Sequence, residues 1–169
     1  MVLRAAGSSV ATDGTATLCR ELLQLIYGTS HRCAVNNMLL QEWRTHSSAF
    51  ARLWMQQMQS RRKLVRVDSG SQLTERVRSA LSPHYPPDAW ANIEKDLHLV
   101  HAALATGGII ISADARARLA FTTACGQIRE LGRICWIKPE ADGDLLFRWL
   151  RGDAEAPRAW NLDPTRESA

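Results

Sequence analysis

Two aspartates, Asp96 and Asp114, lie 18 positions apart at the ends of the stretch DLHLVHAALATGGIIISAD. The first belongs to a helical pattern and the second follows a run of three isoleucines, so a helix packed antiparallel to a strand would bring both carboxylates together. Glu42, in the sequence LLQEWRTH on another predicted helix, is interpreted either as a solvated helix glutamate or, together with Asp96 and Asp114, as a third ligand. Carboxylate oxygens are the ligands that Mg²⁺ and Mn²⁺ prefer, and such ions keep waters that can be activated. These three acids therefore indicate hard-cation chemistry.

The pattern around the two aspartates predicts a helix, a glycine stop and a buried strand. Ile93, Leu97, Val100 and Leu104 recur at the spacing of one helix face. Gly107 and Gly108 end that helix, because glycine enters the left-handed conformation at little steric cost. The isoleucines at 109–111 follow without alternation, as in a parallel strand covered on both faces. The segment after such a strand is where open α/β sheets bind ligands.

This stretch resembles the PIN-domain family of PilT N-terminus-like nucleases. That family has a D-x-x-x-x-x-x-A helix leading into an apolar strand that ends in S/T-x-D, which fits Asp96, Ala103 and the run from Ile110 through Ser112 to Asp114. The resemblance extends more weakly over residues 1–140. It implies hydrolysis of RNA phosphodiester bonds with Mg²⁺ or Mn²⁺, and Glu42, Asp96 and Asp114 as metal ligands and catalytic residues. Ser112 is interpreted first as a strand-end hydroxyl, and second as a group that orients a ligand or water.

One position departs from the family pattern. The first PIN strand ends in an aspartate within a pattern like V-L-D-A, and the matching register here is Val2-Leu3-Arg4-Ala5. Arg4 beside the acids would pair with a carboxylate and lower metal affinity. Asp13 could substitute for the missing acid, although Asp13-Gly14 is more typical of a turn or a helix cap.

The resemblance leaves more than one function open. The leading prediction is a PIN-like ribonuclease, with the toxin of a toxin–antitoxin pair as one role and a protein antitoxin as its partner. The alternative is a catalytically degenerate PIN-like module that binds nucleic acid or a protein partner. An α/β protein with no nuclease ancestry is a third interpretation, and oligomers are compatible with all three.

The fold class predicted is α/β, a three-layer α/β/α domain with a mostly parallel sheet of four or five strands. It spans residues 1–151, and residues 152–169 are expected to form a flexible tail. Asn36 or Asn37, Asp88 and Asp142 are predicted helix N-caps. Strands are predicted near residues 31–35, 64–67, 109–111 and 134–137, and helices near 15–26, 48–60, 73–81, 115–125 and 142–150.

Composition sets wider bounds. The 169 residues are 46% apolar, which is ordinary for one globular domain. No run approaches the ~20 apolar residues of a membrane span, and the N-terminus lacks a signal-peptide core, so a cytoplasmic protein is expected. The net charge of +4 permits a polyanionic partner.

The triplet Arg61-Arg62-Lys63 is interpreted as the charged flank of a strand edge or as a phosphate contact. The scattered cysteines are expected to be reduced and buried, and His98 and His101 to be polar-face residues of their helix.

Overall fold

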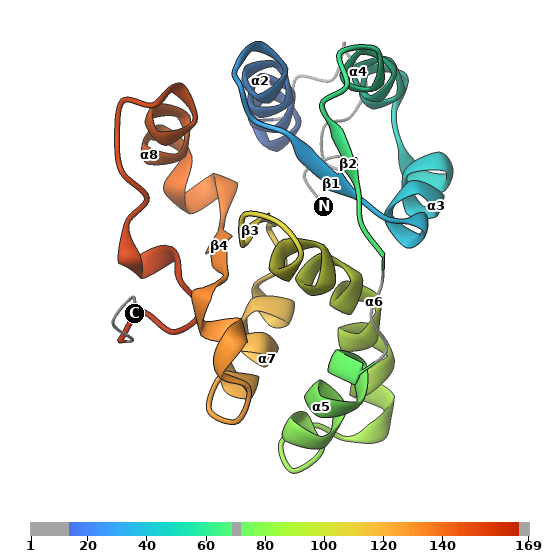
Figure 1. Ribbon diagram of the computed structural model, residues 1–169, viewed down its shortest axis with the longest axis vertical. Helices are drawn as coiled ribbons and strands as arrows, with labels where there is room; N and C mark the ends of the chain where they lie inside the picture. The colour runs from blue at the N-terminus through green and yellow to red at the C-terminus, as the bar shows by residue number, and fades with distance from the viewer. Residues whose placement is uncertain (1–13, 69–71, 166–169) are drawn as a thin grey trace. The chain divides into compact units, whose positions relative to one another are not determined.

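The computed structural model describes residues 14–68 and 72–165, and this part of the chain is mixed α/β and 64% helical (Figure 1). It divides into two compact units. Unit 1 comprises the described residues up to Arg66 with Ile111–Ala113 and Ile137–Ala156, and unit 2 comprises Val67–Ile110, Asp114–Trp136 and the described residues from Pro157. The helices are α2 (Gly14–Gly28), α3 (Asn37–His46), α4 (Ala49–Ser60), α5 (Gln72–Leu81), α6 (Pro87–Leu104), α7 (Ala115–Ala124) and α8 (Pro139–Arg151), with 3-10 turns η1 (Arg129–Arg133) and η2 (Arg158–Trp160).

The strands are short and form two pairs. β1 (Cys33–Val35) lies parallel to β2 (Leu64–Arg66), with Cys33 opposite Leu64 and Val35 opposite Arg66. β3 (Ile109–Ile111) pairs with β4 (Cys135–Ile137), also in parallel. All four strands fall where the apolar runs predict them. The α/β class and the parallel pairing are therefore confirmed.

Unit 1 contains α2, which packs against α8 and α4. Asn36 caps α3 by accepting a hydrogen bond from the Leu39 N–H, as predicted, and Ser48 caps α4 in the same way through the Ala51 N–H. The indole of Trp54 stacks on Trp43 at 5.7 Å and donates to the Leu23 carbonyl of α2 at 2.5 Å. These contacts tie α4 to both α2 and α3.

Unit 2 is built on α5, α6 and α7, which pack against one another. The apolar stripe of α6 is buried as predicted at Ile93, Leu97 and Val100. Gly108 has φ +71° and donates its N–H to the Ala103 carbonyl, so the predicted left-handed glycine stop is confirmed at this position. Ile110 is buried but Ile109 is 38% exposed, so the expectation that β3 is covered on both faces is wrong at its first residue.

Two predicted N-caps were misplaced by a few residues. α6 begins at Pro87 with Pro86 as its cap, which puts Asp88 inside the first turn. α8 begins at Pro139 with Lys138 as its cap. Asp142 accepts the Lys138 N–H at 3.0 Å from one turn further along, which resembles one half of a capping box, because the Lys138 side chain makes no cap hydrogen bond. Proline has no N–H to lose at a helix start, which explains why it begins both helices.

The C-terminal segment that we expected to be a flexible tail is packed over residues 157–162. Trp160 is 2% exposed and Leu162 is 1% exposed. The Leu162 N–H donates to the Ile134 carbonyl, and Asn161 forms an antiparallel bridge with Cys135 of β4. The charged and proline-containing composition concealed these two buried apolar residues, of which Leu162 belongs to the hydrophobic core cluster of unit 2.

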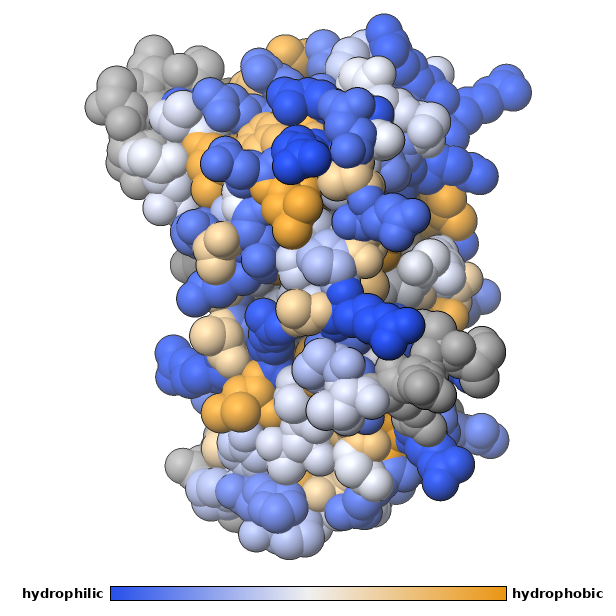
Figure 2. Space-filling model, turned by 90° about the vertical axis from the view of Figure 1, so that its left-hand side faces the viewer, coloured by the Kyte–Doolittle hydropathy of each residue, from blue (hydrophilic) through white to orange (hydrophobic). Residues whose placement is uncertain are grey.

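The exposed apolar residues are dispersed. Figure 2 shows hydrophobic residues as separate small areas among hydrophilic ones on the face that it presents. Within the residues that the structure describes, no helix combines the length and the apolarity needed to cross a bilayer.

Candidate functional site

Asp114 leaves the carboxyl end of β3 and caps α7. Its Oδ1 accepts hydrogen bonds from the N–H groups of Arg116 and Ala117, both at 2.9 Å. The residue is half-buried. An aspartate at this position satisfies two amides of the first helical turn, which have no intrahelical partner. Asp114 therefore has a structural role that the strand-end interpretation missed, although the sequence order strand–Asp–helix carried the signal.

Ser112 lies between β3 and Asp114 and is 1% exposed. Its backbone N–H donates to the Ile137 carbonyl at 3.0 Å, which extends the pairing of β3 with β4. At the other end of the pair the Cys135 N–H donates to the Gly108 carbonyl at 2.8 Å. The strand end that carries Asp114 is thus fixed by backbone hydrogen bonds within two residues of the carboxylate.

Asp96 lies in the middle of α6 and is half-buried at the margin of the helix face that carries Ile93, Leu97 and Val100. Asp96 and Asp114 both belong to unit 2. The sequence predicts this placement of Asp96, on a helix that is followed by the glycine stop at Gly108 and then by β3.

Glu42 lies on α3, in unit 1, and is half-buried next to Trp43. The capped start of α3 at Asn36 and the Trp43–Trp54 stack fix this helix against α4. Over residues 14–68 and 72–165, no three histidine, cysteine, aspartate or glutamate side chains are grouped so that they could hold a metal ion. Arg4 and Asp13, the two positions considered for the first acid of the family pattern, lie outside the described residues.

The two histidines of α6 differ from the polar-face interpretation and from each other. His98 is 3% exposed, so that interpretation is wrong for it. His101 is partly buried, with its Nε2 3.4 Å from the Thr74 Oγ1 of α5, and burial lowers the pKa of its imidazole. The sequence around His98 did not indicate that the helix face carrying this histidine would be buried.

The cysteines are thiols, and no disulfide joins them within the described residues, which include all four. Burial raises the pKa of Cys33 to about 11, with the nearby Lys63 charge acting in the opposite direction. Burial also raises the pKa of Cys135, whose thiol donates to the Asn161 Oδ1. Thiols with raised pKa values are protonated at neutral pH and are poor nucleophiles and metal ligands. They do not add to the candidate site.

The triplet Arg61-Arg62-Lys63 has a structural role that the sequence did not reveal. Lys63 donates from its Nζ to the carbonyls of Ile26, Tyr27 and Thr29, at 2.6, 2.9 and 2.6 Å. It thereby satisfies carbonyls at the C-terminal end of α2, where a cation is favourable. Lys63 is thus committed to the fold of unit 1.

Comparison with protein-family models, with curated proteins and with solved structures gives no significant match.

Proposed function

We propose that this chain is a PIN-like, Mg²⁺- or Mn²⁺-dependent ribonuclease, with Glu42, Asp96 and Asp114 as the acids that hold the ion and promote hydrolysis. The observation that carries the proposal is the position of Asp114, which leaves the carboxyl end of a parallel strand and begins α7. The family pattern places one aspartate on a helix and a second aspartate after the strand that follows. This chain has the same order, with Asp96 on α6, then the glycine stop, then β3 and then Asp114.

The donor set suits the ion. Carboxylate oxygens are hard ligands, and Mg²⁺ sites commonly use a few of them together with water and substrate phosphate. When bound, the ion would supply an activated water and neutralise charge on the scissile phosphate. Asp114 would serve with the carboxylate that also caps α7, and its Oδ1 is held in place by two amide donors.

The proposal includes the finer features of the family. These are a three-layer α/β/α domain with a mostly parallel sheet of four or five strands, RNA as the substrate, and action in the cytoplasm, with a protein antitoxin as partner if the chain is a toxin. Acids that share one ion and its water shell must lie within about 10 Å of one another, because ligand distances are near 2 Å. A crystal structure of the Mn²⁺-soaked protein with these carboxylates further apart would refute the shared site.

A cleavage assay tests the activity. The purified chain is incubated with end-labelled RNA and Mg²⁺ or Mn²⁺, and EDTA should abolish cleavage. Asp114→Asn and Asp96→Asn should each abolish it too, because the amide removes a charged ligand but keeps the side-chain shape. Glu21→Gln, at an exposed position on α2, is the control and should cleave like the parent. Equal cleavage by Asp114→Asn and the parent would show that Asp114 is not a ligand.

The second candidate function is a degenerate PIN-like module without catalysis. Arg4, which stands where the family pattern has its first acid, favours it. Arg4→Asp should then strengthen Mn²⁺ binding in a calorimetric titration, because it removes a competing cation and restores a ligand. Tight Mn²⁺ binding by the parent, unchanged by Arg4→Asp, would show that another residue completes the site, with Asp13 the first to test.

A further inference from the structure

Residues 32–66 of unit 1 are strongly basic. They contain seven arginine or lysine residues and one acid, Glu42. Lys63 donates hydrogen bonds to carbonyls at the C-terminal end of α2. The six arginines are exposed. Within the part of the chain that the structure describes, none of the six forms an ion pair. They are Arg32, Arg44, Arg52, Arg61, Arg62 and Arg66.

The backbone positions of three of these arginines lie close together where the β1–β2 pair begins. Arg61 and Arg62 directly precede Lys63, and the Lys63 carbonyl accepts the N–H of Cys33 at 2.9 Å. Arg32, the residue before Cys33, is therefore brought beside the Arg62–Lys63 backbone. We call Arg32, Arg61 and Arg62 the arginine edge. Figure 1 shows the two strands side by side, with α4 leading into β2.

The backbone at Arg62 adds a second observation. Arg62 has φ +56°, in the left-handed region, and the Lys63 N–H donates back to the Met58 carbonyl at the end of α4. This is the helix-ending geometry in which glycine is favoured, because a side chain in that conformation carries a steric cost. An arginine here destabilises the turn relative to glycine, while placing one more exposed charge on the edge. Such a cost at an exposed charged residue suggests selection for binding.

Arg61 gives the edge a flat surface. Its guanidinium carbon lies 4.1 Å from the centre of the Tyr27 ring and over that ring, so one face of the guanidinium is covered and its orientation is held. Arg61 is nevertheless exposed. Bases of single-stranded nucleic acid stack on arginine planes as well as on aromatic rings. The carboxylates of an acidic protein could form ion pairs with the edge but would not stack on the guanidinium plane of Arg61.

We propose that the arginine edge binds single-stranded nucleic acid, with Arg32 and Arg62 on backbone phosphates and the Arg61 guanidinium under an unstacked base. Guanidinium forks match phosphate oxygens, and the three like charges of the edge, which form no ion pair among the described residues, favour an anionic ligand. The inference goes beyond the proposed ribonuclease and does not depend on it, because none of the three arginines belongs to the proposed metal site.

The test is binding of a fluorescein-labelled 12-nucleotide oligouridylate, followed by fluorescence anisotropy in EDTA so that metal chemistry plays no part. Each phosphate contact on a single strand contributes about −0.7 to the slope of log affinity against log salt. Arg32→Gln/Arg62→Gln should therefore reduce the slope by about 1.4 in magnitude, with an affinity loss of roughly tenfold or more at low salt.

The control is Arg148→Gln/Arg151→Gln in α8. It makes the same change in net charge in the same unit, in the last turn of a helix whose first turn carries the acids Glu140 and Asp142. Its salt slope should equal that of the parent. An unchanged slope for Arg32→Gln/Arg62→Gln, or an equal change in the control, would overturn the proposal.

Two single variants separate binding from fold. Arg62→Gly should raise the melting temperature, because it relieves the left-handed residue, and should weaken oligouridylate binding at the same time. Arg61→Lys keeps the charge but removes the flat face, so affinity should fall several-fold with the salt slope unchanged. Affinity equal to the parent in both variants would overturn the proposed contacts.

The choice of ligand is tested with competitors. A fluorescein-labelled oligoglutamate of matched charge should bind more weakly than the oligouridylate, and a duplex should compete poorly. Oligoglutamate that binds as tightly, with the same dependence on Arg32 and Arg62, would show that the edge serves an acidic protein and would overturn the nucleic-acid assignment. Tight RNA binding without metal-dependent cleavage would leave this inference standing and refute the proposed ribonuclease.

Discussion

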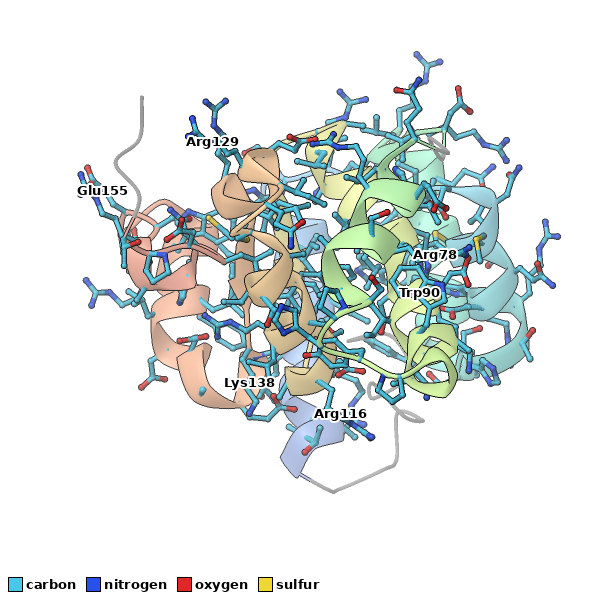
Figure 3. The ribbon with its side chains drawn as sticks, turned by 90° about the horizontal axis from the view of Figure 1, so that it is seen from below. Arg78, Trp90, Arg116, Arg129, Lys138 and Glu155 are labelled. Atoms are coloured by element: carbon cyan, nitrogen blue, oxygen red, sulfur yellow. The ribbon has the colours of Figure 1, made fainter. Side chains whose placement is uncertain are left out.

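In unit 2, arginines face glutamates of neighbouring elements, whereas in residues 32–66 of unit 1 exposed arginines have no acidic partner among the described residues. Arg76 of α5 forms a two-pronged pair with Glu130 of η1, at 2.5 and 3.1 Å. Arg78, also of α5, contacts Glu94 of α6, and its guanidinium carbon lies 5.2 Å from the centre of the Trp90 ring. Figure 3 labels Arg78 and Trp90, which lie next to each other. These side chains join the helices of unit 2 to one another.

In unit 1, side chains join the helices by donating hydrogen bonds to backbone carbonyls. The Trp54 indole donates to Leu23, and Lys63 donates to the end of α2. Because these contacts need no acids, the arginines of residues 32–66 are left to face solvent. The comparison indicates that ion pairs link α5 to its neighbours in unit 2, and that the exposed arginines of residues 32–66 in unit 1 are available for a ligand. Each prediction below tests one side of it.

The largest effect should come from Trp160, which is buried in the C-terminal segment of unit 2. Trp160→Ala removes a side chain that is 2% exposed, and truncation of a buried aromatic costs about 3–5 kcal/mol of unfolding free energy. Urea denaturation measures the loss. Trp149→Ala, at a half-buried position on α8 of unit 1, should cost less. A loss below about 1 kcal/mol for Trp160→Ala would show that the C-terminal segment is dispensable to unit 2.

The next effect concerns Lys63. Lys63→Met leaves three carbonyls of α2 without their charged donor, and hydrogen bonds to charged groups contribute about 1.5–3 kcal/mol each. Water can replace part of this at a helix end, so a total near 2 kcal/mol is expected. Arg62→Met removes the same charge one residue away and should change the unfolding free energy little. If both variants lose equal stability, Lys63 acts only through its charge.

The sequence predicted the elements better than the contacts between them. Periodicity located the buried face of α6, the glycine stop at Gly108 and all four strands, because local backbone preferences and burial on one face leave a pattern in the sequence. His98 was misjudged because its burial depends on which helices cover α6. Trp160 was misjudged because its neighbours are charged and it has no periodic partners.

The candidate site was predictable in part for the same reason. The positions of Asp96 on a helix and Asp114 at a strand end follow from local pattern. The capping role of Asp114 requires knowing that α7 starts one residue later. The position of Arg32 beside the Arg62–Lys63 backbone follows from the parallel register of β1 and β2, which joins residues about thirty positions apart and leaves no local signal.

A smaller effect should separate the two roles of Asp114. Asp114→Ala removes the N-cap of α7 and should cost about 1 kcal/mol, whereas asparagine caps a helix as well as aspartate does. Asp114→Asn should therefore retain the stability of the parent, or exceed it if nearby carboxylates repel each other in the metal-free protein. Thermal unfolding of both variants decides this. Equal losses for alanine and asparagine would mean that the charge, and not the cap, stabilises α7.

The smallest effect should come from the Arg76–Glu130 pair, whose side chains are 51% and 42% exposed. The hydrogen bond from Arg76 holds the pKa of the Glu130 carboxyl below its ordinary value of 4.5. A carboxyl whose folded pKa is depressed stabilises the protein above its unfolded pKa and loses that contribution as pH falls through the folded pKa. Glu130→Gln should therefore lower the melting temperature slightly at pH 7. The difference from the parent should shrink below about pH 4.5 and in high salt.

The control is Glu155→Gln, at an exposed position between α8 and η2 that Figure 3 labels. Glu155 forms no ion pair among the described residues, so its variant should follow the parent at every pH. A Glu130→Gln difference that persists unchanged at pH 3 would show that the pair does not hold α5 to η1 through charge, and would remove one of the two arginine contacts on which the contrast between the units rests.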